Sequence, residues 1–144
     1  MARKGRTNKA ELLRKVSLFS ACSTKELARI AALADEADVE AGRVLTKEGL
    51  PGGEFFVISD GQATASLRGK KLATLKAGDF FGEMSLLDHG PRSATVKADT
   101  PMHLLVVDPR SFASLVDDVP SVARKIMRGL AERLRNSEKA PAQH

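Results

Sequence analysis

The sequence contains no tryptophan, no tyrosine and a single cysteine, Cys22. A lone cysteine cannot form a disulfide within the chain, so we expect a cytoplasmic rather than a secreted protein. The N-terminus is basic but lacks the apolar segment of a secretory signal. No apolar run approaches the ~18 residues that a transmembrane helix needs. These absences exclude a disulfide scaffold and argue against a membrane-spanning protein.

Catalytic and metal-binding patterns are also missing. The three histidines, His89, His103 and His144, lie far apart and form no His-x-His pair, so a metal-binding jelly roll is poorly supported. No Ser-His-acid or Cys-His combination is evident. We therefore expect neither an enzyme nor a resident metal or cofactor.

Charge is unevenly distributed along an otherwise ordinary composition. The chain has 144 residues, of which 42% are hydrophobic and 28% charged, as in one soluble globular domain. The net charge of +5 comes from the ends, because residues 1–15 carry +5, residues 121–144 carry +4 and the body carries −4. Basic ends can attract nucleic acid or an anionic membrane. Because no helix-turn-helix or aromatic stacking set accompanies them, we expect solvated tails, and nucleic acid is not the expected partner.

Two helices are predicted near the start of the chain. Residues 9–15 predict a short helix, with Asn8 as its N-cap. Ser23 or Thr24 opens a second helix, in which apolar residues recur at helical spacing as far as Ala34.

Glycines divide the segment from Asp38 to Val107 into short strands. This pattern predicts a compact all-β roll or barrel. Residues 68–70 predict a tight hairpin tip between strands over 63–67 and 71–75. The dividing glycines are Gly42, Gly49, Gly52, Gly53, Gly61, Gly69, Gly78 and Gly90.

Two further helices are predicted after the strands. Asp108 and Pro109 form a good N-cap and first-turn pair for the first of them. Pro120 begins the second, which carries an apolar stripe at four-residue spacing. The stripe consists of Val122, Ile126, Leu130 and Leu134.

The segment from Phe81 to Val96, FGEMSLLDHGPRSATV, carries the clearest chemistry. Gly82 and Glu83 open a short apolar turn whose backbone N–H groups can face a phosphate. Arg92 offers a planar fork that matches two phosphate oxygens. An acid beside a phosphate is repulsive unless the ligand also presents hydroxyl donors, so Glu83 indicates a phosphorylated sugar. The plainer alternative is a surface ion pair between Glu83 and Arg92, worth roughly 0–1 kcal/mol.

This segment resembles the phosphate-binding cassette of cyclic nucleotide-binding domains. Phe81 to Leu86 fill the first half of the family pattern and Arg92 to Val96 fill the second. Upstream, a glycine-punctuated motif runs from Val44 to Gly61. Thr46 stands there where an apolar residue is common, and Leu50 stands where a polar one is; both are expected at a turn rather than at the ligand. The similarity covers roughly residues 12–135.

The resemblance implies a mainly β fold with flanking helices. The expected core is an eight-stranded jelly-roll-like β roll, with N-terminal helices before it and two C-terminal helices after it. The expected boundaries are a basic N-terminal tail over 1–11, the domain over 12–135, and a C-terminal tail over 136–144. Within the domain, helices are expected at about 12–34, the roll at about 38–107 and helices at about 109–135.

The resemblance also implies the ligand and its site. The ligand would be a 3′,5′-cyclic nucleotide, cAMP rather than cGMP, because position 93 holds serine instead of threonine. With no Tyr or Trp available, an apolar residue of the last helix (Met127, Leu130 or Leu134) or Arg133 would cover the base. The expected ligand-binding residues are Gly82, Glu83, Met84, Ser85, Arg92, Ser93 and Ala94 around the phosphate and ribose, Val57, Leu72 and Val96 around the base, and Arg133 in the lid.

The implied function is a regulatory sensor whose C-terminal helices move when the ligand binds. Its partner would be an effector protein in trans or an effector domain missing from this chain. The alternative is a nucleic-acid-binding or protein-interaction domain of the same fold that does not respond to cyclic nucleotide.

Overall fold

The computed structural model describes residues 8–139, except for the side chains of residue 133 and residues 137–139. The chain enters through helix α1 (Lys9–Arg14), a 3₁₀ turn η1 (Ser17–Phe19) and helix α2 (Thr24–Leu33). The expected caps are present. Asn8 accepts from the backbone of the first turn of α1, and Ser23 forms a capping box with Glu26. Helix α1 therefore begins inside the tail predicted over 1–11.

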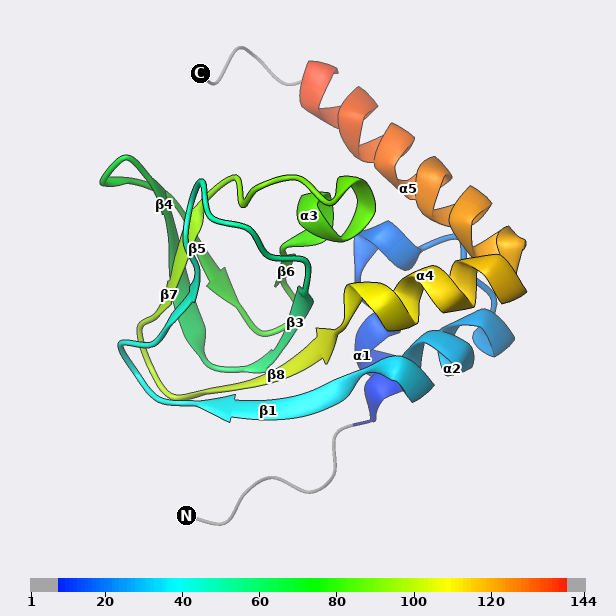
Figure 1. The fold of residues 1–144 in the computed structure, drawn as a ribbon, viewed down its shortest axis with the longest axis horizontal. Helices are drawn as coiled ribbons and strands as arrows, with labels where there is room; N and C mark the ends of the chain where they lie inside the picture. The colour runs from blue at the N-terminus through cyan, green and yellow to red at the C-terminus, as the bar shows by residue number, and fades with distance from the viewer. Residues whose placement is uncertain (1–7, 140–144) are drawn as a thin grey trace.

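Eight strands occur between residues 8 and 139, in two antiparallel four-stranded sheets that form a roll (Figure 1). One sheet has the order β1-β8-β3-β6 and the other β2-β7-β4-β5. The predicted mainly β, eight-stranded fold is confirmed. The strands are β1 (Asp35–Val39), β2 (Val44–Thr46), β3 (Phe55–Asp60), β4 (Gln62–Leu67), β5 (Lys70–Lys76), β6 (Phe80–Phe81), β7 (Thr95–Ala98) and β8 (Met102–Val107).

The hairpin predicted at residues 68–70 joins β4 to β5. Leu67 pairs with Lys70, and the two residues between them, Arg68 and Gly69, both have positive φ, at 52° and 81°. This is the conformation whose twist matches a two-residue hairpin, and glycine adopts it without strain.

Two hydrophobic cores meet at β3, whose residues Phe55 to Ile58 are all buried. Phe55 and Val57 belong to the core shared with the helices. Phe56 and Ile58 belong to the core inside the roll. Successive side chains of a strand point to opposite faces, so this strand separates the two cores.

Helices α4 (Pro109–Asp118) and α5 (Pro120–Lys139) follow the roll, and a short helix α3 (Glu83–Asp88) interrupts it. Asp108 caps α4 as predicted, accepting from the Ser111 backbone at 3.0 Å. In Figure 1, helices α1, α2, α4 and α5 gather on one side of the roll. Helix α5 runs to Lys139, beyond the predicted boundary at 135.

Two contacts fix α5 against the N-terminal elements. Ser121 and Lys125 both donate to the buried carboxylate of Glu26, Lys125 at 2.7 Å. Further along α5, Gly129 lies so close to the 3₁₀ turn that an added Cβ would be 2.6 Å from the carbonyl oxygen of Leu18. The first half of α5 is therefore held to α2 and η1.

None of the helices between residues 8 and 139 combines the length and apolar character that a membrane span requires.

Candidate functional site

A cavity of about 330 Å³ opens into the roll beside α3. This volume lies in the range of small-molecule sites. Its walls come from β2, β4, β5, β6 and β7, from the start of α3 and from the loop before β7. The structure brings nine of the eleven predicted ligand-binding residues to it: Leu72, Gly82, Glu83, Met84, Ser85, Arg92, Ser93, Ala94 and Val96.

Arg92 is the buried charge of this cavity. Only 7% of the residue is exposed. Its Nη1 donates to the backbone carbonyl of Glu54 at 2.9 Å, and its Nη2 lies 3.2 Å from the Glu54 carboxylate. The guanidinium carbon also lies 5.8 Å from the ring centre of Phe56, within cation–π range. Burial lowers the pKa of Arg92, and the negative charge of Glu54 opposes that shift, so the guanidinium keeps its proton.

Two glycines lie so close to this guanidinium that no larger residue fits without a shift. A Cβ on Gly52 would lie 2.4 Å from Nε of Arg92, and one on Gly82 would lie 3.1 Å from Nη1. Gly82 has a φ of 88°, and its Cβ would also meet the Glu54 carbonyl at 2.6 Å. Glycine is thus required at 82 by backbone geometry as well as by space. The planar side chain is confined before any ligand arrives.

Helix α3 presents the acid and the apolar turn of the predicted cassette. Gly82 is its N-cap, Glu83 is its first residue, and Ser85 and Leu86 are buried. Met84 is half exposed. Leu86 packs in the core shared with the helices, so α3 links the cavity to that core.

The loop that carries Arg92 is tied to the turn after β2. The backbone of Arg92 accepts from Gly49 N–H at 2.9 Å and donates to the Leu50 carbonyl at 3.0 Å. Leu50 lies at this turn, as expected. Thr46 does not: it lies in β2, is buried, and lines the cavity, so the expectation that it lies at a turn is wrong.

Val57 was predicted to line the base pocket, and this prediction is also wrong. The side chain is fully buried among the helix-facing residues of β3, on the far side of the strand from the roll interior. An unbroken apolar strand offers no alternation from which the facing side could be read. The side chain of Arg133 lies outside the described residues.

None of the described side chains of α5 lines the roll cavity. Met127 and Leu130 instead line a separate apolar hollow of about 350 Å³ between α3, α4 and α5. Met127 and Leu134 are more than half exposed. The structure therefore places Met127 and Leu130, two of the expected lid residues, away from the roll cavity.

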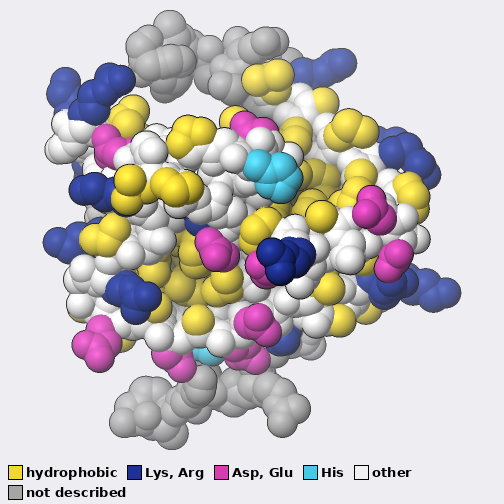
Figure 2. All heavy atoms as spheres, viewed as in Figure 1, with side chains coloured by type: hydrophobic (Ala, Val, Ile, Leu, Met, Phe, Trp, Pro, Cys, Tyr) yellow, Lys and Arg dark blue, Asp and Glu magenta, His cyan; other side chains and the backbone are white. Residues whose placement is uncertain are grey.

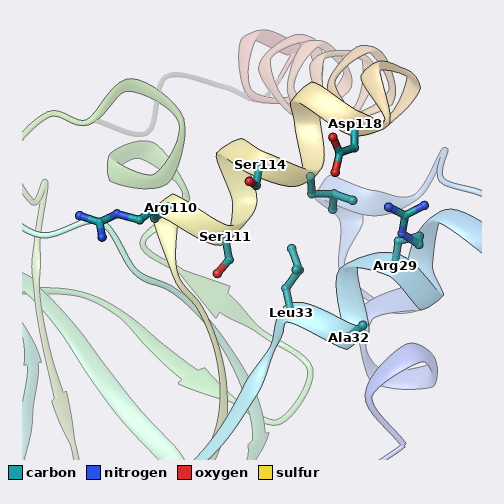
Figure 3. Close-up of a pocket in the computed structure, with 8 residues that line it drawn as sticks. Arg29, Ala32, Leu33, Arg110, Ser111, Ser114 and Asp118 are labelled. Atoms are coloured by element: carbon teal, nitrogen blue, oxygen red, sulfur yellow. The ribbon is translucent and has the colours of Figure 1, made fainter.

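A third cleft, of about 320 Å³, lies between α2 and α4 (Figure 3). Its Arg110 side chain points away from the other labelled residues, and Ser111 is engaged with the N-cap Asp108. No predicted ligand-binding residue lines it. The charged, glycine-crowded roll cavity is the stronger candidate site.

Charged groups also occur elsewhere in the described part of the chain. Among residues 8–139, no cluster of three or more His, Cys, Asp or Glu side chains could hold a metal. His103 bridges Glu36 and Asp38 at 2.6 and 2.7 Å across β8 and β1. Partial burial opposes its charge, but the two carboxylates outweigh it and raise the pKa of His103. On the face in Figure 2, Lys and Arg lie mostly around the outline, with acidic and apolar side chains between them.

Comparison with known proteins places this geometry in context. Residues 36–118 match the sequence profile of the cyclic nucleotide-binding domain. The cAMP-dependent protein kinase regulatory subunit of Emericella nidulans is 35% identical over 115 residues, which are 78% of this chain and 28% of that protein. The chain thus spans less than a third of that relative's length.

Two solved structures show the same fold. The N-terminal domain of a transcriptional regulator from Streptomyces coelicolor superposes with a TM-score of 0.78 at 30% identity, over 96% of this chain and 98% of that one. The regulatory domain of Toxoplasma gondii protein kinase A, crystallised with cAMP, superposes with a TM-score of 0.69 at 28% identity, over 76% and 44% of the two chains.

Proposed function

Because the chain belongs to the cyclic nucleotide-binding domain family, we propose that it is a sensor whose roll cavity binds cAMP in preference to cGMP. The single observation that supports this most is the confined guanidinium of Arg92, which lines the same cavity as Glu83. A planar cation held in place suits a phosphate, and a nearby acid suits the hydroxyl of a sugar attached to it.

In this proposal each wall of the cavity binds one part of the ligand. Arg92 pairs with the cyclic phosphate, helped by backbone N–H groups near Met84, Ser85 and Ala94. Glu83 accepts from the ribose 2′-hydroxyl. A hydrogen bond to a shielded carboxylate contributes roughly 1.5–3 kcal/mol and opposes the repulsion between this acid and the phosphate.

The base would lie against the apolar strands. Leu72 and Val96 line the cavity together with small residues of β4 and β5. Leu72 is 58% exposed, so a bound purine would cover apolar surface that otherwise meets water. Ser93 supports cAMP over cGMP through the family resemblance, since threonine at this position would favour cGMP.

The response would travel from α3 to the C-terminal helices. A ligand shifts a conformation only when it binds one state better. Drawing α3 toward the phosphate would move Leu86, which packs in the same core as Phe112 of α4 and Ile126 of α5. Helices α4 and α5 would then move onto the roll and present a different surface to an effector, either another protein or a further domain.

Calorimetric titration with cAMP and with cGMP tests the proposal. We expect the native protein to bind cAMP more tightly than cGMP, and Arg92→Ala to weaken binding at least ~30-fold, since truncating one partner of a buried charge pair costs about 2–5 kcal/mol. Arg68→Ala, at the exposed hairpin tip, is the matched control and should bind as the native protein does. Failure of the native protein to bind either nucleotide rejects the proposal.

A further inference from the structure

A buried hydroxyl faces the loop that holds Arg92. Thr46, at the end of β2, is 6% exposed and lines the roll cavity. A buried hydroxyl requires a partner. Here Oγ1 of Thr46 donates to the backbone carbonyl of Ala94 at 2.9 Å, across 48 positions of the chain.

An irregularity in the sheet explains why a side chain makes this bond. Val44 pairs with Lys97 and Thr46 pairs with Val96, so two steps along β2 correspond to one step along β7. Such a bulge re-aims side chains and ends regular pairing. Ala94 lies just before β7 begins at Thr95. The Thr46 hydroxyl supplies a donor where the regular strand has ended.

The remainder of the loop is tied to the same turn by other groups. The Thr95 hydroxyl donates to the Glu48 carboxylate at 2.8 Å and accepts from the Glu48 N–H at 3.1 Å. Arg92 is tied through its own backbone to residues 49 and 50. Arg92, Ala94 and Thr95 are therefore each held by hydrogen bonds to residues 46–50, and the bond to Ala94 comes from the cavity-lining side chain of Thr46.

We propose that Thr46 is a positioning residue for the anion-binding loop, an inference that rests on the proposed binding of a cyclic nucleotide. By holding the Ala94 carbonyl, the hydroxyl fixes the peptide that follows Ala94 and limits rotation at Ala94 itself. It also satisfies the negative end of a carbonyl dipole at the cavity wall, where an unpaired oxygen would repel a phosphate. Thr46 thereby acts on the phosphate through Ala94, without touching it.

The test replaces the hydroxyl with a methyl group of the same shape. We expect Thr46→Val to weaken cAMP binding about 10-fold, because the loop that carries Arg92 and Ala94 is then no longer held in the geometry that binds the phosphate. Thr46→Ser, which keeps the hydroxyl, should stay within about threefold of the native affinity. Thr64→Val is the matched control, because the Thr64 hydroxyl bonds Asp99 away from the cavity. Thermal melting identifies any variant that does not fold, and Thr46→Ala then takes the place of Thr46→Val.

A second readout separates positioning of the phosphate site from simple packing. Adenosine, which lacks the cyclic phosphate, is titrated against each variant and followed by amide chemical shifts, which report weak binding. We expect Thr46→Val to leave adenosine binding unchanged. Equal losses for adenosine and cAMP, an equal loss in Thr46→Ser, or native cAMP affinity in Thr46→Val would each overturn the role of Thr46. A native protein that does not bind cAMP would instead reject the proposed function.

Discussion

Arg92 and Glu54 are joined twice, once through the backbone carbonyl of Glu54 and once through its carboxylate, although they are 38 residues apart. The arginine side chain is 6% exposed and the glutamate side chain 49% exposed. The pair therefore consists of a buried cation and an acid that reaches it from the solvent side. A ligand phosphate would become a second counter-charge for the same guanidinium.

Removing the Glu54 charge should raise the affinity for cAMP and lower the stability of the ligand-free protein. Glu54→Gln keeps the backbone contact but takes away the counter-charge, which costs the unliganded protein about 1 kcal/mol for a partly exposed pair. The bound phosphate compensates for that loss, so cAMP affinity should rise by about fivefold. Thermal melting with and without cAMP measures both effects, and Glu40→Gln is an exposed-acid control. A lower affinity in Glu54→Gln would show that the carboxylate orients Arg92 more than it competes with phosphate.

A side chain at position 52 should lower cAMP affinity more than it lowers the stability of the fold. In Gly52→Ala the new methyl group would lie 2.4 Å from Nε of Arg92, so the guanidinium must shift. We expect a loss of cAMP affinity of at least about 10-fold, because even small misplacements of a positioning group are costly. The melting temperature should change little. Gly90→Ala is the control, since its methyl group meets only the end of the Asp88 side chain. Native affinity in Gly52→Ala would mean that Arg92 is not the phosphate ligand or has room to move.

Loss of the Glu83 carboxylate should reduce cAMP affinity less than loss of the Arg92 side chain. Glu83→Ala removes a proposed hydroxyl contact, whereas Arg92→Ala removes the main counter-charge of the phosphate. The specific check is 2′-deoxy-cAMP, which lacks the hydroxyl: its binding should be insensitive to Glu83→Ala, while cAMP binding falls by about 10-fold or more. An equal loss for both nucleotides would place Glu83 elsewhere than at the 2′-hydroxyl.

Low pH should weaken the contact between α5 and Glu26 of α2. The hydrogen bond from Lys125, followed by that from Ser121, lowers the pKa of Glu26 from 4.5 to about 2. Because the folded-state pKa lies below the unfolded one, Glu26 stabilises the protein above about pH 5, and this contribution, up to about 3 kcal/mol, is lost as the pH falls toward 2. Chemical denaturation at pH 7 and pH 3 should show a smaller pH effect in Glu26→Gln than in the native protein. The same pH effect in both proteins would contradict this.

Ligand should change hydrogen exchange in the C-terminal helices. Saturating cAMP is expected to alter amide protection across residues 109–135, since α3 and these helices share one core. Amides of the central strand β8 serve as the internal reference. Unchanged protection in 109–135 at saturation would limit the protein to binding without the proposed movement.

The sequence predicted the lining of the roll cavity best where the lining residues are contiguous. The run from Gly82 to Val96 contains eight residues that line the cavity, because one local segment carries α3, the loop and the start of β7. Helix caps at Asn8, Ser23 and Asp108 were predicted for the same reason, since a cap acts over three residues.

Features made by distant segments were missed. Glu54 and Gly52 lie in the loop between β2 and β3 and contact Arg92 from a distant part of the chain, and no spacing in the sequence encodes that approach. An acid directly after two glycines and before a buried strand was the one available signal. The facing side of Val57 depended on which side of β3 the helices cover, which a uniformly apolar run does not record.

The close approach of Gly129 to Leu18 divides α5 into two arms. The first arm is tied to Glu26, and the second runs from Gly129 to Lys139, about 15 Å at 1.5 Å per residue. A contact this tight leaves little room for sliding, so a movement of α5 relative to η1 would have to be a tilt about this point. By simple leverage, a tilt of about 10° there would carry the far end of this arm roughly 3 Å. An effector bound at the end of the helix would thus receive a displacement set by the length of this arm.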